Sequence, residues 1–258
     1  MTLYGLYGRD EHNWLSVSSV VRLLGDLGVD SAGVRSSISR LKRRGILVAD
    51  RLGGAAGYGL SARAREILAE GDRRIFHRRV ATLKDGWVLA VFSVPETQRS
   101  RRHTLRSRLS WLGFGSVAPG VWIAPAHLAD ETRDVLTELG LAGYVDLFTA
   151  RAVDAVNLAA DVARWWNLER IRTAYAGYIE AWQPVASAWQ RRRRVDVEQA
   201  FVDYVQTLTG WRRLPYLDPG LPAELLPPDW PAGEAAEVFL GLHDRLRAPA
   251  HEFVESVR

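Results

Sequence analysis

The most informative stretch of this sequence is VRSSISRLKRRG, which spans residues 34–45. At the helical spacing of ~100° per residue, Val34, Ile38 and Leu41 share one narrow apolar face that can pack on a neighbouring helix. Ser36, Ser39, Arg40 and Arg43 fall on the opposite face, Arg35 and Lys42 flank them, and Arg44 precedes Gly45 as a further candidate for DNA contact. Guanidinium groups bind guanine edges or phosphates in a bidentate manner, and short hydroxyls allow close approach. The pattern predicts a recognition helix for the major groove of DNA.

The flanking sequence predicts the rest of a winged helix-turn-helix. A preceding helix is expected over residues 17–27, with Ser16 as its N-cap and a Gly28 turn after it; Asp30 or Ser31 would cap the recognition helix. After Gly45 we expect a strand at 46–48, a Gly-rich turn at 53–57, a return strand at 58–60 and a helix from Ser61 to about residue 68. Arg51, just before the turn, is placed to reach the phosphate backbone from the wing.

Residues 81–150 predict a second, ferredoxin-like domain. The apolar run WVLAVFSV at 87–94 has the length of a buried strand and is followed by Pro95. The remaining expected elements are a helix at 96–112, a hairpin at 114–123 that turns at 118–120, a helix at 128–139 and a strand at 144–148. The order β-α-β-β-α-β is that of the split-βαβ fold.

The last zone, from about Asp154 onward, is rich in aromatic residues and is expected to be mostly helical. A Pro-rich stretch at 214–231 predicts an ordered loop, and a final helix is expected over 234–246. The predicted fold class is therefore α+β, with a winged-helix DNA-binding domain and linker helix at 1–80, a ferredoxin-like domain at 81–150 and a helical effector and dimerisation domain at 151–258.

The composition is that of a globular protein, with 47% hydrophobic and 25% charged residues among 258. The absence of cysteine excludes a disulfide framework and a thiolate metal site. No signal peptide and no apolar run of ~18 residues is visible, so a cytoplasmic protein is expected. The net charge is +4 and is unevenly distributed: residues 1–80 carry 14 Lys and Arg against 8 Asp and Glu, whereas residues 151–258 carry 13 against 15. The positive charge thus coincides with the predicted DNA-binding domain.

Seven segments carry a resemblance to a known family. They are TLYGLYGR (2–9), VRSSISRLKRRG (34–45), EGDRRIF (70–76), FSVPE (92–96), GFG (113–115), PGVWIAP (119–125) and LDPGLPAELLPPDW (217–230). Together they resemble the PaaX family of phenylacetic-acid catabolism repressors. The resemblance implies a winged-helix N-terminal domain, a Cas2-like middle domain and a helical C-terminal domain. It also implies a homodimer that binds operator DNA, represses aromatic-acid catabolic genes and is released by an aryl acyl-CoA, typically phenylacetyl-CoA.

The sequence departs from many relatives at the wing tip, where it has GGAAG at 53–57 instead of basic residues. This departure leaves more of the DNA contact to the recognition helix.

For the effector, Arg99, Arg102 and Arg106 form a stripe at i, i+3 and i+7 that is a candidate phosphate site or a solvated helix face. Further candidates for the effector site are Trp122, Arg212 and Arg213, although most of the aromatic residues are expected in the core. The run Arg191–Arg194 is expected to be solvated, or to contact DNA or a second protomer.

No catalytic motif is visible. The sequence has no HExxH, Walker A, GxGxxG or GxSxG pattern, and its histidines form no metal signature; they are His12, His77, His103, His127, His243 and His251. We therefore expect no enzyme activity, no bound metal and no cofactor. Two alternatives remain: a constitutive DNA-binding scaffold without an effector, and a Mg²⁺-dependent nuclease of the Cas2-like domain. The nuclease alternative has only Glu96 as a carboxylate next to the first strand.

Overall fold

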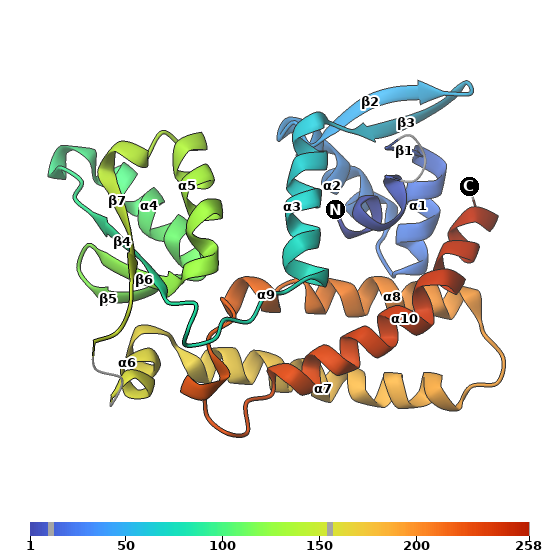
Figure 1. Cartoon of the computed structure of the whole chain (residues 1–258). Coiled ribbons are helices and arrows are strands. Elements are labelled where there is room, and N and C mark those ends of the chain that lie inside the picture. The colour runs from blue at the N-terminus through green and yellow to red at the C-terminus, as the bar shows by residue number, and fades with distance from the viewer. Residues whose placement is uncertain (10–12, 154–156, 258) are drawn as a thin grey trace. The chain divides into compact units, whose positions relative to one another are not determined.

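The computed structural model describes residues 1–9, 13–153 and 157–257, so His12 and Asp154 lie outside the described residues. These residues form two compact units (Figure 1). Unit 1 comprises Met1–Phe76, Tyr178–Trp211 and Glu234–Arg258, and unit 2 comprises His77–Gly177 and Arg212–Gly233. The C-terminal helices therefore contribute to both units. No helix in the described parts is long and apolar enough to cross a membrane.

The N-terminal part of unit 1 has the predicted order of two helices, a hairpin and a further helix. Its elements are the π-helical turn η1 (Tyr4–Gly8), β1 (Trp14–Ser16), α1 (Val17–Asp26), α2 (Ser31–Arg43), β2 (Leu47–Leu52), β3 (Ala55–Leu60) and α3 (Ala62–Phe76). The strands form an antiparallel sheet in the order β1-β3-β2. Neither η1 nor β1 was predicted, because both are short and β1 is defined only by its pairing with β3.

Three local signals set the ends of these helices. The Ser16 side chain accepts a hydrogen bond from Ser19 N at 3.0 Å, as predicted. Of the two expected caps of α2, Asp30 is the one observed, and it accepts from Gly33 N at 2.6 Å. Gly45 has a φ of +65°, which suits the left-handed turn after α2.

The predicted turn at 53–57 was too long. Only Gly53 and Gly54 form it, with φ of +57° and +84°, while Ala55 already pairs with Leu52 in the hairpin. Two positive φ angles at the centre of a two-residue turn match the twist of the flanking strands. The prediction that α3 ends near residue 68 was also wrong, since α3 continues to Phe76. A tertiary contact accompanies this extension: Arg9 Nη2 donates to Asp72 Oδ1 at 3.0 Å.

The remaining helices of unit 1 are the C-terminal part of α7 (Leu168–Arg191), α8 (Val197–Trp211) and α10 (Ala232–Ser256). Their aromatic side chains form much of the core, as expected; Trp189, Phe201, Tyr204, Trp211 and Phe239 are all buried. The predicted end of the last helix at 246 was wrong, because α10 continues through Pro249. Ala250, Phe253 and Val254 extend its buried face beyond the proline. Packing of this face outweighs the lost backbone hydrogen bond.

Unit 2 contains the predicted βαββαβ order. The strands are β4 (Trp87–Phe92), β5 (Gly115–Ala118), β6 (Val121–Pro125) and β7 (Val145–Ala150), and the helices are α4 (Arg99–Leu112) and α5 (Ala129–Glu138). The sheet is antiparallel in the order β5-β6-β4-β7. A core with Val88, Leu105, Trp122 and Leu136 joins the helices to one sheet face. Trp87 and Ile123, on the other face, pack with Val162 and Trp166 from and just after α6 (Leu158–Trp165).

The Pro-rich stretch belongs to unit 2 and is more regular than predicted. It contains the short helix α9 (Leu214–Leu217) and the 3-10 turn η5 (Ala223–Leu225). Between them, Asp218 is buried, forms an ion pair with Arg78 and accepts from Tyr175 Oη at 3.1 Å. Pro222 and Pro215 lie at the starts of helical turns, where a missing N–H costs no internal hydrogen bond.

Candidate DNA-binding interface

The outward face of α2 presents hydroxyl and basic side chains. Its inward face is fixed by Val34 and Ile38, which are buried. All the predicted DNA-contacting residues of this segment are exposed, namely Arg35, Ser36, Ser39, Arg40, Lys42, Arg43 and Arg44. Arg40, Lys42 and Arg43 lie in the last turn, where the partial negative charge of the helix C-terminus favours cations. The structure therefore places the predicted residues on one accessible helix.

The cations of this face have no carboxylate partner in the part of the chain that the structure describes. Within residues 1–9, 13–153 and 157–257, no ion pair involves Arg35, Arg40, Lys42, Arg43, Arg44 or Arg51. Instead, Arg35 Nη2 donates to Ser31 Oγ and Arg40 Nη2 donates to Ser37 Oγ, each at 3.3 Å. Lys42 Nζ lies 5.5 Å from the centroid of the Tyr58 ring. These weak contacts leave the positive charges available to external phosphates.

The β2–β3 hairpin has a small, nearly uncharged tip. Arg51 is exposed and pairs across the hairpin with Ala56, one position before the strand end. Gly53 and Gly54, which have no side chains, form the turn itself. Arg51 is therefore the basic side chain nearest the tip, and its contact with the phosphate backbone stays a prediction.

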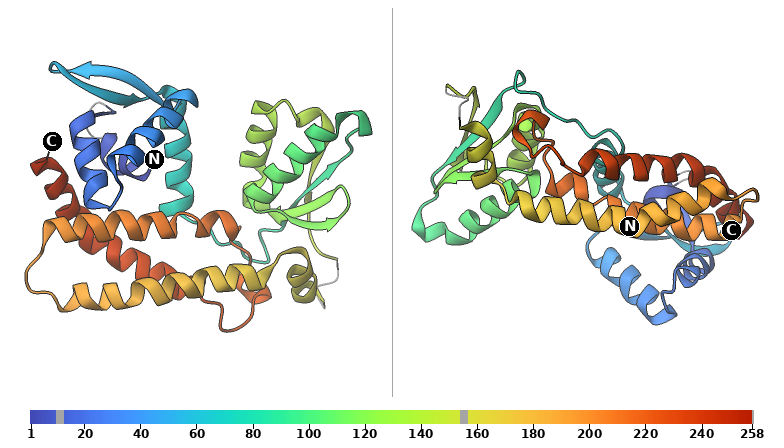
Figure 2. Two further views of the ribbon diagram at one scale, coloured as in Figure 1. Left: turned by 180° about the vertical axis from the view of Figure 1, so that it is seen from behind. Right: turned by 90° about the horizontal axis from the view of Figure 1, so that it is seen from below.

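The base of the hairpin is joined closely to β1. A Cβ atom on Gly57 would lie 2.2 Å from the Trp14 ring and 2.5 Å from the Leu15 carbonyl oxygen. Glycine at this position thus allows β1 to pair with β3. In Figure 2, α1 and α2 project from the layer formed by the long helices of unit 1.

The candidate effector residues fall into two groups. Arg99, Arg102 and Arg106 lie on α4, and Arg102 is already engaged: it forms a 2.7 Å ion pair with Glu96 and donates to the Val94 carbonyl at 2.8 Å. Trp122 is only 8% exposed and belongs to the core of unit 2. Its indole ring is therefore part of the domain interior rather than the wall of an open pocket.

Arg212 and Arg213 lie near the other end of α4. They directly precede α9, whose Tyr216 ring contacts Trp111 in the last turn of α4. Arg99 and Trp111 are twelve positions apart on one helix, which corresponds to roughly 18 Å. The structure thus separates Arg99 and Arg102 from Arg212 and Arg213.

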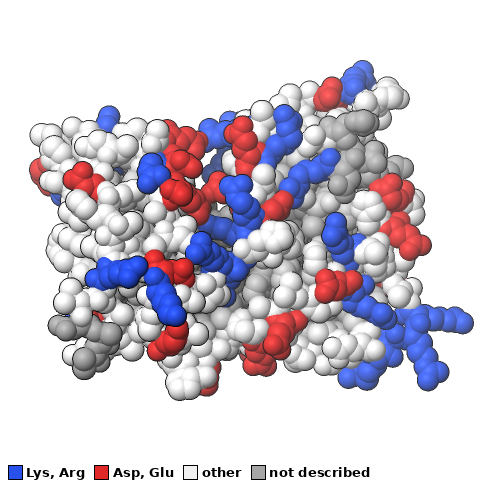
Figure 3. Space-filling view, in the orientation of Figure 1, with Lys and Arg blue, Asp and Glu red and all other residues white. Residues whose placement is uncertain are grey.

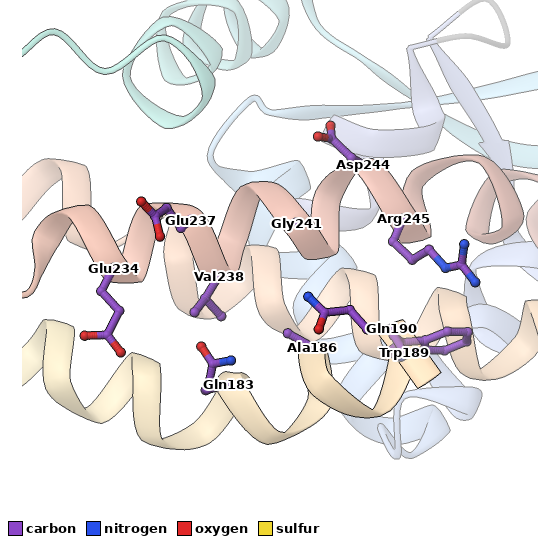
Figure 4. Close-up of a pocket in the computed structure, with 10 residues that line it drawn as sticks. All are labelled: Gln183, Ala186, Trp189, Gln190, Glu234, Glu237, Val238, Gly241, Asp244 and Arg245. Carbon is purple, nitrogen blue, oxygen red and sulfur yellow. The ribbon is translucent and has the colours of Figure 1, made fainter. Parts of the chain in front are cut away.

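A groove lies between α7 and α10 in unit 1 (Figure 4). Its volume is about 610 Å³, which is the size of a small-molecule site. Glu234, Glu237 and Asp244 line it, with Arg245 as the basic residue of the lining. This excess of carboxylates would repel the phosphates of a CoA thioester. No sequence pattern indicates the groove, because its walls come from two helices that are far apart in the chain.

The run Arg191–Arg194 begins at the last residue of α7 and is exposed. Basic side chains project at the connection between α7 and α8 in Figure 3. The Arg192 guanidinium lies 4.3 Å from the centroid of the Trp189 ring. The backbone carbonyl of Arg192 accepts a hydrogen bond from Arg245 Nη2 at 3.3 Å. These contacts attach the start of the run to unit 1 and leave its charge in solvent.

Glu96, the carboxylate considered for a nuclease, is exposed and forms the ion pair with Arg102. In the described part of the chain, no group of three or more His, Asp or Glu side chains is arranged to hold a metal ion. Glu96 therefore belongs to no such group in the described residues.

Comparison with known proteins covers nearly the whole chain. Residues 1–64 match the family model of the PaaX-like protein, residues 80–162 that of the PaaX protein central Cas2-like domain, and residues 166–256 that of the PaaX-like protein C-terminal domain. A curated relative, Transcriptional repressor PaaX of Escherichia coli (strain K12), is 27% identical over 259 residues, which cover 98% of this chain and 81% of the relative.

A solved structure, that of the uncharacterized protein Rv0674 from Mycobacterium tuberculosis, superimposes with a TM-score of 0.60 at 26% identity. The match covers 99% of this chain and 96% of that protein. Order, spacing and coverage agree with the resemblance noted in the sequence. The chain belongs to the PaaX family, whose members are transcriptional repressors rather than enzymes.

Proposed function

We propose that this protein is a DNA-binding transcriptional repressor that uses α2 as its recognition helix and the β2–β3 hairpin as its wing. The observation that carries this proposal is the exposed row of basic side chains on α2, none of which pairs with a carboxylate in the described residues. Arg40 and Arg43 are suited to base edges or phosphates, and Ser36 and Ser39 permit close approach. The Escherichia coli relative is itself named a transcriptional repressor.

The repressor is proposed to act as a homodimer. Helix-turn-helix proteins commonly bind two half-sites about 34 Å apart, so that a two-fold axis of the protein matches a palindromic operator. Two copies of α2 would then occupy successive major grooves. A protein that regulates genes in this way would work in the cytoplasm of a bacterial cell.

The effector is proposed to be an aryl acyl-CoA, such as phenylacetyl-CoA, and the target genes those of aromatic-acid catabolism. The support for both is the family resemblance. The thioester would bind more tightly to a dimer whose recognition helices no longer match adjacent grooves, and would thereby shift the population away from the DNA-bound form.

The first experiment measures fluorescence anisotropy of labelled DNA from the protein's own promoter. We expect saturable binding that Arg40→Gln and Arg43→Gln each weaken by about fivefold or more, because each substitution removes a base or phosphate contact worth roughly 1–3 kcal/mol. Arg170→Gln, which removes an exposed arginine of unit 2, is the matched control and should bind as the wild type does. Equal affinity of all four proteins would contradict the role of α2.

The second experiment adds acyl-CoA thioesters to the same complex. Release of the DNA by phenylacetyl-CoA, but not by acetyl-CoA, would support the aryl effector. DNA binding that no thioester changes would instead favour a constitutive DNA-binding scaffold.

A further inference from the structure

A cluster of aromatic and basic side chains lies where α4 meets α9 in unit 2. The rings of Trp111 and Tyr216 are 5.0 Å apart at an interplanar angle of 33°. The guanidinium carbon of Arg108 lies 5.9 Å from the centroid of the Trp111 ring. Arg212 and Arg213 come four and three positions before Tyr216. We refer to these five residues as the Trp111 cluster.

The backbone around the Trp111 cluster is held by close packing. Gly113 ends α4 with a φ of +98°, and a Cβ atom there would lie 2.7 Å from Pro219 Cβ. Trp166 Nε1 donates to the Gly113 carbonyl at 2.8 Å. On the other side, buried Asp218 accepts from Gly220 N at 2.8 Å. The two aromatic rings are thus mounted on a pre-organised scaffold, which lowers the entropic cost of binding a ligand.

The arginines of the Trp111 cluster have no counter-ion among the described residues. Arg212 is half-buried, and among the described residues no ion pair joins Arg108, Arg212 or Arg213 to a carboxylate. Burial, and then the neighbouring Arg213, lower the pKa of the Arg212 guanidinium from its ordinary value. A partly buried cation without a counter-ion is unfavourable. An external anion would relieve this cost.

The aromatic part of the cluster is accessible. Trp111 is 38% exposed although it is one of the largest apolar side chains. An exposed indole beside arginines can stack on a planar base, while guanidinium groups bind phosphate in a bidentate manner. The combination therefore fits a ligand that carries both a planar ring and phosphate groups. The acidic groove between α7 and α10 lacks this charge.

We propose that the Trp111 cluster binds the nucleotide moiety of a small ligand, with the base on Trp111 and the phosphates on Arg108, Arg212 and Arg213. The chemistry is that of an adenine nucleotide, whether free or as part of coenzyme A. The regulatory meaning of the site rests on the proposed function, since the nucleotide part of a CoA effector would bind here.

The test is calorimetric titration of the full chain with coenzyme A, phenylacetyl-CoA and ADP. We expect Trp111→Leu and Arg212→Gln each to raise the Kd of coenzyme A by about tenfold or more, because they remove stacking and a charged hydrogen bond respectively. Arg170→Gln is again the control and should leave the Kd unchanged. Trp111→Phe keeps an aromatic face and should restore most of the affinity. Thermal unfolding by circular dichroism verifies that each variant is folded.

The probes separate the sources of the ligand. Binding of ADP as tightly as coenzyme A would support a site for free nucleotides, and binding of the CoA compounds alone would support a site for thioesters. The proposal is overturned if no probe binds the wild type, if folded Trp111→Leu and Arg212→Gln bind as the wild type does, or if single-stranded DNA alone binds the cluster.

Promoter binding measured on the same samples keeps the two proposals apart. A wild type that binds its promoter but none of the three probes would refute the nucleotide site and leave the repressor intact. A wild type that binds coenzyme A through the cluster but binds no DNA would refute the repressor alone.

Discussion

His243 on α10 lies among aromatic rings of unit 1. Its ring centroid is 5.1 Å from that of Phe76 and 5.8 Å from that of Phe239, and its Nδ1 is 2.8 Å from Tyr204 Oη. Burial, and then the nearby Arg247, lower the pKa of His243 from 6.5, while Asp244 opposes this shift. The neutral imidazole is therefore the form that the folded protein favours.

This environment predicts a pH-dependent stability. Above pH 6.5 the imidazole is neutral in both the folded and the unfolded chain, and its contribution is fully present. As the pH falls from 6.5 through the lower folded pKa, the unfolded chain binds the proton first, so stability is lost. Urea unfolding of the wild type and of His243→Gln between pH 5 and pH 8 should show a flatter profile for the variant. Parallel profiles would contradict this assignment; His103→Gln, at an exposed position, is the control.

At the residue scale, the predicted DNA-contacting residues and the predicted effector residues differ in solvent exposure. The side chains of the first set are exposed, whereas Trp122 of the second is buried. Arg40 and Arg43 of α2 could be assigned from the sequence because helical spacing alone places them opposite Val34 and Ile38. Arg102 and Trp122 belong to a different case. The sequence shows that an arginine can bind phosphate and that a tryptophan can bind an aryl group. It does not show that Arg102 is already paired with Glu96, or that Trp122 is buried in the core of unit 2.

At the scale of elements, β3 holds the N-terminal sheet together because it lies between β1 and β2. Gly57 pairs with Ser16 on one side and Asp50 on the other. Its missing side chain leaves space for the Trp14 ring. The sequence presented this glycine as part of a turn, whereas its role is to let two strands and an indole approach each other.

Substitutions in β3 can test this role. Gly57→Ala should destabilise the protein by about 1–3 kcal/mol, because its methyl group would overlap the Trp14 ring and the Leu15 carbonyl. The free energy of unfolding in urea measures the effect.

Gly59→Ala is the matched control for this substitution. Its nearest contact is the Asn13 carbonyl oxygen at 3.5 Å, an ordinary separation, so the change should be neutral or slightly stabilising. Equal losses of unfolding free energy in the two variants would show that the strand propensity of alanine, rather than the overlap with Trp14, causes the destabilisation.

For the whole molecule, the concentration of positive charge in residues 1–80 predicts a strong salt dependence of DNA binding. A dimer that presents two copies of α2 and Arg51 would make roughly 6–10 phosphate contacts. Its affinity should then fall on the order of 10³-fold between 50 and 200 mM salt.

The slope of log K against log salt provides the measurement. Arg43→Gln should reduce the slope by about one to two units per dimer if the residue contacts a phosphate in each copy. A slope near zero for the wild type would be incompatible with the proposed interface, and an unchanged slope would exclude a phosphate contact of Arg43.

The sequence by itself determined the order of the main helices and strands in residues 17–150, the basic face of α2 and the family. These features depend on periodicities and segments that are local in the chain: the 3.6-residue spacing of Val34 and Ile38, the alternation of strands and helices in residues 81–150, and the motifs shared with the PaaX family.

Only the tertiary structure decided which distant residues meet. It extended α10 through Pro249, since buried Ala250 and Phe253 continue its apolar face. It also brought Trp111 and Tyr216 together over more than a hundred residues of sequence. The start of α4, where Arg102 pairs with Glu96, therefore has different neighbours from its end, where Trp111 contacts Tyr216. Such contacts arise from packing between segments remote in the chain, and no local pattern of side chains encodes them.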